Sequence, residues 1–108
     1  MKEYILAITT CPKDESKDLA DALVKSKKCA CVNIIPGIKS IYHWRGSIET
    51  GEESILLMKT EKELSNELWD ILKEHHSYEV PEFVIIPIAG GSEAYLKWIS
   101  ESVRNGPE

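Results

Sequence analysis

The sequence predicts an α+β fold, with one antiparallel sheet and its helices on one face. Four runs are rich in β-branched and aromatic residues, and three other segments carry apolar residues at the spacing of one helical face. We expect the strands near residues 4–10, 30–44, 48–59 and 83–88, and the helices near 13–27, 60–76 and 92–103. The order is β-α-β-β-α-β with an extra C-terminal helix. The split β-α-β motif occurs twice, which is the ferredoxin-like arrangement.

Length and composition favour a single domain, residues 1–108, with one modest core. The chain has 108 residues, of which 43% are hydrophobic and 29% are charged, and its formal net charge is −5. Its largest basic group is Lys25, Lys27 and Lys28, which argues against a surface for nucleic acid or anionic membrane. No apolar run approaches the roughly 20 residues of a membrane-spanning helix.

The cysteines and the first residues indicate the compartment. The chain has 3 cysteines, an odd number that does not suit a framework of disulfides. Lys2 and Glu3 lead straight into an apolar strand, so the features of a secretion signal are missing. Reduced thiols are typical of the cytosol. We therefore expect a cytoplasmic protein.

The first strand and helix follow from short local patterns. Tyr4–Thr10 is apolar and rich in β-formers, which predicts a buried strand that Cys11 and Pro12 end. Lys13–Lys27 is predicted to be a helix. Its apolar face consists of Leu19, Ala20, Leu23 and Val24.

The segment from residue 30 to residue 60 predicts a long β-hairpin. Ala30–Trp44 and Ile48–Lys59 are the two strands, and Arg45, Gly46 and Ser47 form the link. Fifteen extended residues at about 3.3 Å each reach about 50 Å, whereas a domain of this size has a radius of gyration near ~13 Å. Even if Pro36-Gly37 bends the arm, its tip overhangs the domain. The tip carries several acidic residues: Glu49, Glu52 and Glu53.

The hairpin also predicts assembly. In the ferredoxin-like arrangement the strand that starts at Ala30 lies at an edge of the sheet, and Tyr42 and Trp44 lie on its overhanging part. A long apolar edge must be paired or covered, and another copy of the chain can do both. Head-to-tail pairing of such edges stays soluble only if the ring of copies closes.

The C-terminal half contains two more helices and a strand. Thr60 with Glu63 predicts a capping box, and the apolar stripe of that helix consists of Leu64, Leu68, Ile71 and Leu72, extended by His75 and His76. A loop, Tyr78–Glu82, leads to the strand Phe83–Ile88, in which Pro87 indicates a sheet edge or a strand end. Ser92 is expected to cap the last helix, whose apolar face consists of Tyr95, Leu96, Ile99 and Val103. Gly106-Pro107 is assigned to a frayed tail.

Few residues have the spacing of a catalytic or metal site. Cys29 and Cys31 would place two thiols on one face of a strand, which suits Cu(I), although a buried apolar role for Cys31 is the commoner outcome. Adjacent His75 and His76 do not have the spacing of a His-Glu-x-x-His zinc motif, and His75 suits a core or helix-cap role equally.

The motifs of common enzyme classes are missing. The sequence has no dinucleotide-binding glycine motif, no P-loop and no Gly-x-Ser-x-Gly elbow. Gly90-Gly91-Ser92 favours a plain turn and cap over an anion site. We therefore expect a protein without catalytic activity.

Several motifs, taken together, resemble the signature of the CutA family. They are Ala30-Cys31-Val32-Asn33-Ile34-Ile35-Pro36-Gly37; then Ser40, Tyr42, Trp44, Gly46, Ile48 and Glu49; Lys59-Thr60; residues 76–82; and Tyr95-Leu96-Lys97-Trp98. The resemblance covers nearly the whole chain. It implies a ferredoxin-like homotrimer, related in architecture to the PII signalling proteins. It also implies a role in divalent-cation tolerance, with binding of copper and other divalent metals. The chain departs from the family pattern at Ser77, where the family usually has proline.

The resemblance guides the choice of metal ligands. The histidine of the family motif is His76, with Tyr78 and Glu82 following it. We take His76 and Glu82 as ligands of a divalent ion, copper before others, with Cys11 as a soft ligand from the end of the first strand. The alternative is a PII-like signalling or scaffold protein that binds a small molecule or protein partner in clefts between subunits. The residues that favour this alternative are Lys59, Tyr78, Glu82, Tyr95 and Trp98.

Overall fold

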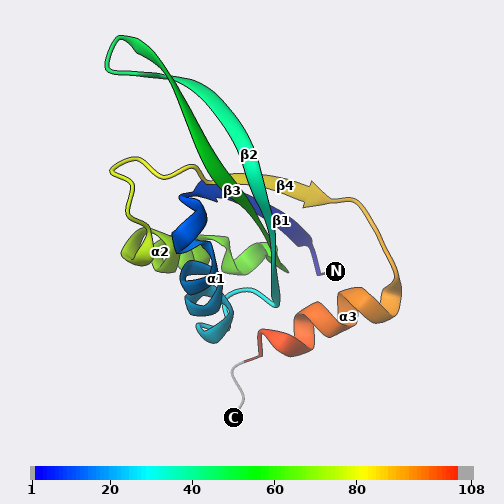
Figure 1. The fold of residues 1–108 in the computed structure, drawn as a ribbon. Coiled ribbons are helices and arrows are strands. Elements are labelled where there is room, and N and C mark those ends of the chain that lie inside the picture. The colour runs from blue at the N-terminus through cyan, green and yellow to red at the C-terminus, as the bar shows by residue number, and fades with distance from the viewer. Residues whose placement is uncertain (1, 105–108) are drawn as a thin grey trace.

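The computed structural model describes residues 2–104, and this part of the chain folds around one antiparallel sheet in the order β2-β3-β1-β4 (Figure 1). The strands are β1 (Tyr4–Cys11), β2 (Cys31–Trp44), β3 (Ser47–Glu61) and β4 (Val84–Ile88). The α-helices are α1 (Ser16–Lys25), α2 (Ser65–His75) and α3 (Glu93–Ser102). Short 3-10 turns at Lys13–Glu15 and Lys62–Leu64 lead into α1 and α2. The α+β class and the order of elements predicted from the sequence are confirmed.

The core lies between the sheet and the pair α1 and α2. Along β1, Ile5, Ala7, Thr9 and Cys11 are buried, and the residues between them are partly exposed, as expected for a sheet covered on one face. The core cluster consists of Ala7, Cys11, Leu19, Ala20, Leu23, Cys29, Leu56, Met58, Leu68 and Leu72. Val24, expected on the core face of α1, is instead 41% exposed. The helix also ends earlier than expected, at Lys25, and Lys27 follows it with a left-handed φ of 64°.

The hairpin of β2 and β3 is confirmed, with a tighter link than the sequence suggested. Trp44 pairs with Ser47, so only Arg45 and Gly46 form the turn, and both have positive φ (49° and 83°). Two such residues make the turn whose twist matches that of the flanking strands. A register shift between Ile35 and Ile38 marks the bend expected at Pro36-Gly37. The arm projects well beyond the helices in Figure 1, where it forms the upper part of the molecule.

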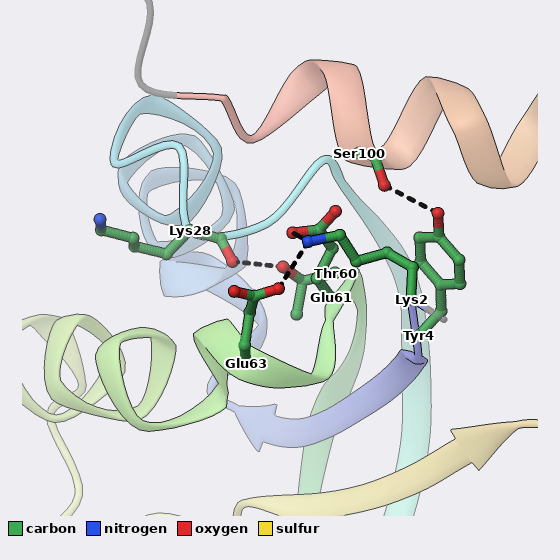
Figure 2. Close-up of polar contacts among 7 residues, drawn as sticks. All are labelled: Lys2, Tyr4, Lys28, Thr60, Glu61, Glu63 and Ser100. Carbon is green, nitrogen blue, oxygen red and sulfur yellow. Dashed lines mark hydrogen bonds and ion pairs between the residues drawn. The ribbon is translucent and has the colours of Figure 1, made fainter.

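The predicted capping box at Thr60 is wrong. Thr60 pairs with Ile5 and remains in β3, and its side chain is fully buried. Its Oγ1 donates a 2.7 Å hydrogen bond to the carbonyl of Lys28, as Figure 2 shows. Thr60 therefore ties the segment after α1 to the sheet, and α2 begins later without a side-chain cap. Pairing with a strand far away in the sequence overrides the local capping pattern.

A charged cluster lies where β1 begins and β3 ends (Figure 2). Lys2 Nζ lies 2.6 Å from Glu63 Oε1 and 3.6 Å from Glu61 Oε1. The side chain of Glu61 is almost fully buried, so this cation offsets part of the cost of burying a carboxylate. Tyr4 and Ser100 share a 2.7 Å hydrogen bond in the same region, which joins α3 to the sheet.

The remaining C-terminal predictions have mixed outcomes. β4 is an edge strand, as Pro87 indicated, but Phe83 precedes it and stacks on Trp69 with ring centroids 5.0 Å apart. Ser92 caps α3 by accepting a hydrogen bond from the backbone N–H of Tyr95. Gly106-Pro107 lies outside the described residues.

Apolar side chains are exposed on both edge strands. In β2, Ile34 and Ile35 are exposed, and so are Val84, Ile85 and Ile86 in β4. Tyr42 and Trp44 on the hairpin arm are also exposed, at 46% and 40%. Within residues 2–104, none of the helices is long and apolar enough to cross a membrane.

Candidate functional site

His76 joins the end of α2 to the end of β1. Its backbone N–H caps the helix by donating to the carbonyl of Leu72, and its buried ring points toward Thr10. The ring nitrogen Nδ1 accepts a 3.1 Å hydrogen bond from the backbone N–H of Tyr78, so Nδ1 carries no proton. The other nitrogen, Nε2, therefore carries the proton and donates it to the carbonyl of Thr10 at 2.7 Å. Both ring nitrogens are engaged with the backbone.

The neighbouring His75 has a local role. Its side chain is exposed, and its Nδ1 donates a 3.0 Å hydrogen bond to the carbonyl of Ile71 in its own helix. This is the helix-cap role that the sequence left open for His75. The predicted extension of the apolar stripe of α2 therefore holds for the buried His76 and is wrong for His75.

Thr10 brings two of the predicted ligands close together. Its carbonyl accepts from His76, and its hydroxyl donates to Glu82 Oε1 at 3.5 Å. Glu82 is exposed, so its carboxylate is open to solvent. His76 and Glu82 thus both contact Thr10, near the end of β1.

Cys11, the third predicted ligand, lies in the core. Its side chain is fully buried, and burial raises the pKa of its thiol to about 11, with smaller contributions from Glu15 and Glu53. The thiol is therefore protonated at neutral pH, and a protonated thiol is a poor metal ligand. Among residues 2–104, no group of three or more His, Cys, Asp and Glu side chains has an arrangement that could hold a metal ion.

The other two thiols do not form the expected pair on a strand. Cys29 precedes β2 and is buried in the core, and burial raises its pKa to about 12. Cys31 heads β2, as predicted, but it is partly exposed and its Sγ lies 3.7 Å from Asn33 Oδ1. The buried apolar role expected for Cys31 therefore belongs to Cys29.

A second buried contact lies beside His76 and was missed from the sequence. Tyr78 donates a 2.5 Å hydrogen bond to Glu53 Oε2, and the Tyr78 ring lies 4.7 Å from the His76 ring, centroid to centroid. Burial, followed by this hydrogen bond, raises the pKa of the Tyr78 hydroxyl well above its ordinary value. Glu53 is only 8% exposed, although the sequence placed it on a solvated tip. Its position two residues before Ile55, where the apolar part of β3 begins, was the available signal.

The hairpin arm and the 78–82 loop enclose a groove, which we call the hairpin groove. Its volume is about 630 Å³. One side is formed by residues 40–44 and Glu53, and the other by residues 78–80 and Glu82, with Thr10 between them. Arg45, at the turn, lies 3.0 Å from Glu79 Oε1 and so links the tip of the arm to the loop.

A different polar group lies at the other end of β3. Lys59 Nζ donates to Asn33 Oδ1 at 2.7 Å and to the Tyr95 hydroxyl at 3.3 Å. The Tyr95 ring packs on Trp98 with centroids 5.4 Å apart. Glu53 and Lys59 are six residues apart on one strand, which corresponds to about 20 Å. On a single chain, the five residues expected near a subunit boundary are thus divided between two places.

Comparison with known proteins identifies the family. A family model described as "CutA1 divalent ion tolerance protein" matches residues 5–102. The chain belongs to the CutA1 family. The resemblance inferred from the sequence is confirmed.

Relatives extend the CutA1 match over the whole fold. The divalent-cation tolerance protein CutA of Thermus thermophilus is 40% identical over 100 residues, which cover 93% of this chain and 97% of that protein. The crystal structure of CutA1 from Oryza sativa matches with a TM-score of 0.91 and 40% identity over 96% of both chains. A Nostoc structure described as "PII-like protein CutA" matches with a TM-score of 0.86 and 31% identity, covering 96% of this chain and 98% of that one.

Some CutA relatives are much longer. The chain spans 56% of the length of the chloroplastic CutA proteins of two plants that it matches at 40% identity. Its similarity to those proteins therefore covers one part of each.

Proposed function

We propose that this CutA1 protein acts in divalent-cation tolerance as a homotrimer that binds divalent metal ions, copper before others. The observation that carries the assembly is the row of exposed apolar side chains on both edge strands and on the hairpin arm. The function itself is supported by the family description and by the name of the Thermus relative.

The assembly follows from the edges of the sheet. β2 and β4 each leave one row of backbone groups unpaired, and both strands carry exposed Ile or Val side chains. Contact between the β2 edge of one copy and the β4 edge of the next is heterologous, and it gives a soluble assembly only if the rotation between copies closes a ring. Three copies is the number implied by the CutA resemblance. Sedimentation equilibrium at micromolar concentration tests it, and a stable folded monomer would refute the proposal.

Metal binding is proposed through His76 and Glu82, with Cys11 as a soft ligand. A single chain does not gather three such side chains within residues 2–104, so the proposal requires neighbouring subunits to complete the ligand set. The residues fit a weak divalent site: Glu82 is open to solvent, whereas His76 must give up a backbone hydrogen bond and Cys11 must lose its proton.

Titration calorimetry with Cu(II) and Zn(II) tests the metal site. We expect Glu82→Gln to weaken Cu(II) binding several-fold. Glu74→Gln, the same change of charge on the exposed face of α2, should leave it unchanged. Equal Cu(II) affinity in both variants and in the unmodified protein would remove Glu82 from the site.

A PII-like role in binding small molecules is the second candidate, and the hairpin groove favours it. The groove combines rings and carboxylates in a volume that is typical of small-molecule sites. Calorimetry with a panel of nucleotides and other small molecules distinguishes this role from metal tolerance. In either role we propose a cytoplasmic protein without catalytic activity, and the buried thiols Cys11 and Cys29 fit a reducing compartment.

A further inference from the structure

We propose that the hairpin groove binds a small organic cation that carries a guanidinium or ammonium group. This inference rests on the second candidate function, a small-molecule role, and specifies the chemistry of the ligand. The volume of about 630 Å³ suits a ligand of metabolite size.

The charge of the groove selects a cation. Three of its lining side chains are carboxylates, Glu53, Glu79 and Glu82, and none of the described residues that line it is Lys or Arg. Glu53 carries the argument because its side chain is more than nine-tenths buried. Tyr78 donates to Glu53 Oε2, and no donor within residues 2–104 reaches Oε1. Among the described residues the buried side-chain oxygens without a partner are Ser54 Oγ and Glu61 Oε2, so Glu53 Oε1 keeps access to the groove, where it can accept from a cation.

The rings of the groove favour an organic cation over a bare metal ion. In a single chain, Tyr42, Trp44 and Tyr78 line it with between 36% and 46% of their surface exposed, and this surface can contact a ligand. Aromatic faces attract guanidinium and ammonium groups. A metal ion would need several donors at one point, and within the described residues no set of three acidic, His or Cys side chains provides them.

The chain's own Arg45 shows how a guanidinium fits at the mouth of the groove. Its guanidinium carbon lies 5.2 Å from the centroid of the Trp44 ring, and its Nη2 lies 3.0 Å from Glu79 Oε1. Arg45 therefore contacts one ring, that of Trp44, and one carboxylate, that of Glu79. Glu53 and Glu82 form no ion pair within the described residues and can bind a second cation. Because Trp44 is the residue expected at the subunit boundary, the proposed trimer would enclose the ligand further.

The probe is agmatine, which has a guanidinium at one end and an ammonium at the other. Its uncharged control is N-butylurea, which has a similar planar head group. Titration calorimetry at low salt should show agmatine binding and no N-butylurea binding, and added salt should weaken the agmatine signal. Light scattering on the same samples records the oligomeric state.

Three variants locate the site. Glu53→Gln removes the charge and keeps an oxygen that can accept from Tyr78, and we expect it to weaken agmatine binding about tenfold. Glu74→Gln should change the affinity less than about twofold, because Glu74 lies outside the groove. Arg45→Asn should tighten binding about threefold, since it frees Trp44 and Glu79, and Asn tolerates the positive φ of this position.

These experiments test the cation site in the hairpin groove independently of the proposed trimer. Agmatine binding that weakens in Glu53→Gln and strengthens in Arg45→Asn supports the site. Equal binding of N-butylurea, no loss in Glu53→Gln, or no binding to a protein that remains assembled would overturn it. The last outcome would leave the trimer and the metal proposal standing.

Discussion

Replacing His76 by Ala should destabilise the fold before it affects any ligand. The substitution removes the hydrogen bond to the Thr10 carbonyl and the one from the Tyr78 N–H. A typical hydrogen bond contributes about 0.5–1.5 kcal/mol net, so the loss of both predicts about 1–3 kcal/mol, before the lost packing of a buried ring. His75→Ala is the matched control, because His75 is exposed and bonds only to its own helix. We expect it to cost less than about 0.5 kcal/mol.

Urea unfolding, followed by circular dichroism at one fixed chain concentration, measures the difference. Fixed concentration is required because assembly contributes to the apparent stability. With a slope of about 2 kcal/mol per M, the midpoint for His76→Ala should fall by on the order of 1 M. Equal midpoints for His76→Ala and His75→Ala would refute the conclusion that the His76 side chain stabilises the fold by linking α2 to β1. A metal titration of His76→Ala therefore has to be made without urea, under conditions in which the variant is shown to be folded.

Three other predictions concern the thiols, the assembly and the buried hydroxyl. Iodoacetamide at pH 8 should modify Cys31 in the native protein and spare Cys11, as peptide mass mapping would show. Because burial raises the pKa of Cys11 from 9.0 to about 11, the contribution of its protonated thiol to stability is full below pH 9 and is lost as pH rises from 9 to 11. In urea unfolding, Cys11→Ala should therefore reduce the loss of stability over this pH range. Trp44→Ala should weaken assembly more than substitutions on the outer faces of the helices, measured by sedimentation equilibrium, and an unchanged association constant would argue against the hairpin as the assembly element. Thr60→Val should cost about 1–3 kcal/mol in urea unfolding, because the carbonyl of Lys28 loses its donor while the volume of the side chain is kept; a smaller loss would mean that water replaces the hydroxyl.

Local chemistry in the sequence predicted much of the fold. Gly37 and Pro87 have backbone requirements that point to a bend and to an edge strand, and both appear where expected. The capping box failed because Thr60 finds its strand partner Ile5 across the sheet, and no local pattern records that pairing. Element types were thus more predictable than their ends.

The candidate site was harder to predict because its contacts join distant segments. The carbonyl that fixes His76 belongs to Thr10, 66 residues away, and Glu53 meets Tyr78 across 25 residues. The sequence showed imidazole, phenol and carboxylate groups in residues 76–82. It did not show that two backbone groups already occupy the imidazole or that a hairpin residue is buried against the phenol.

The place of β1 in the sheet sets the order in which this chain can fold during synthesis. β1 is made first, but both of its neighbours, β3 and β4, come later in the sequence. The hairpin of β2 and β3 closes through a two-residue turn and can form locally, whereas β1 waits unpaired until residues 54–61 have left the ribosome. Its second edge stays open until residues 84–88 emerge, so a nascent chain that stalls before β4 exposes one of the two inner strands of the sheet.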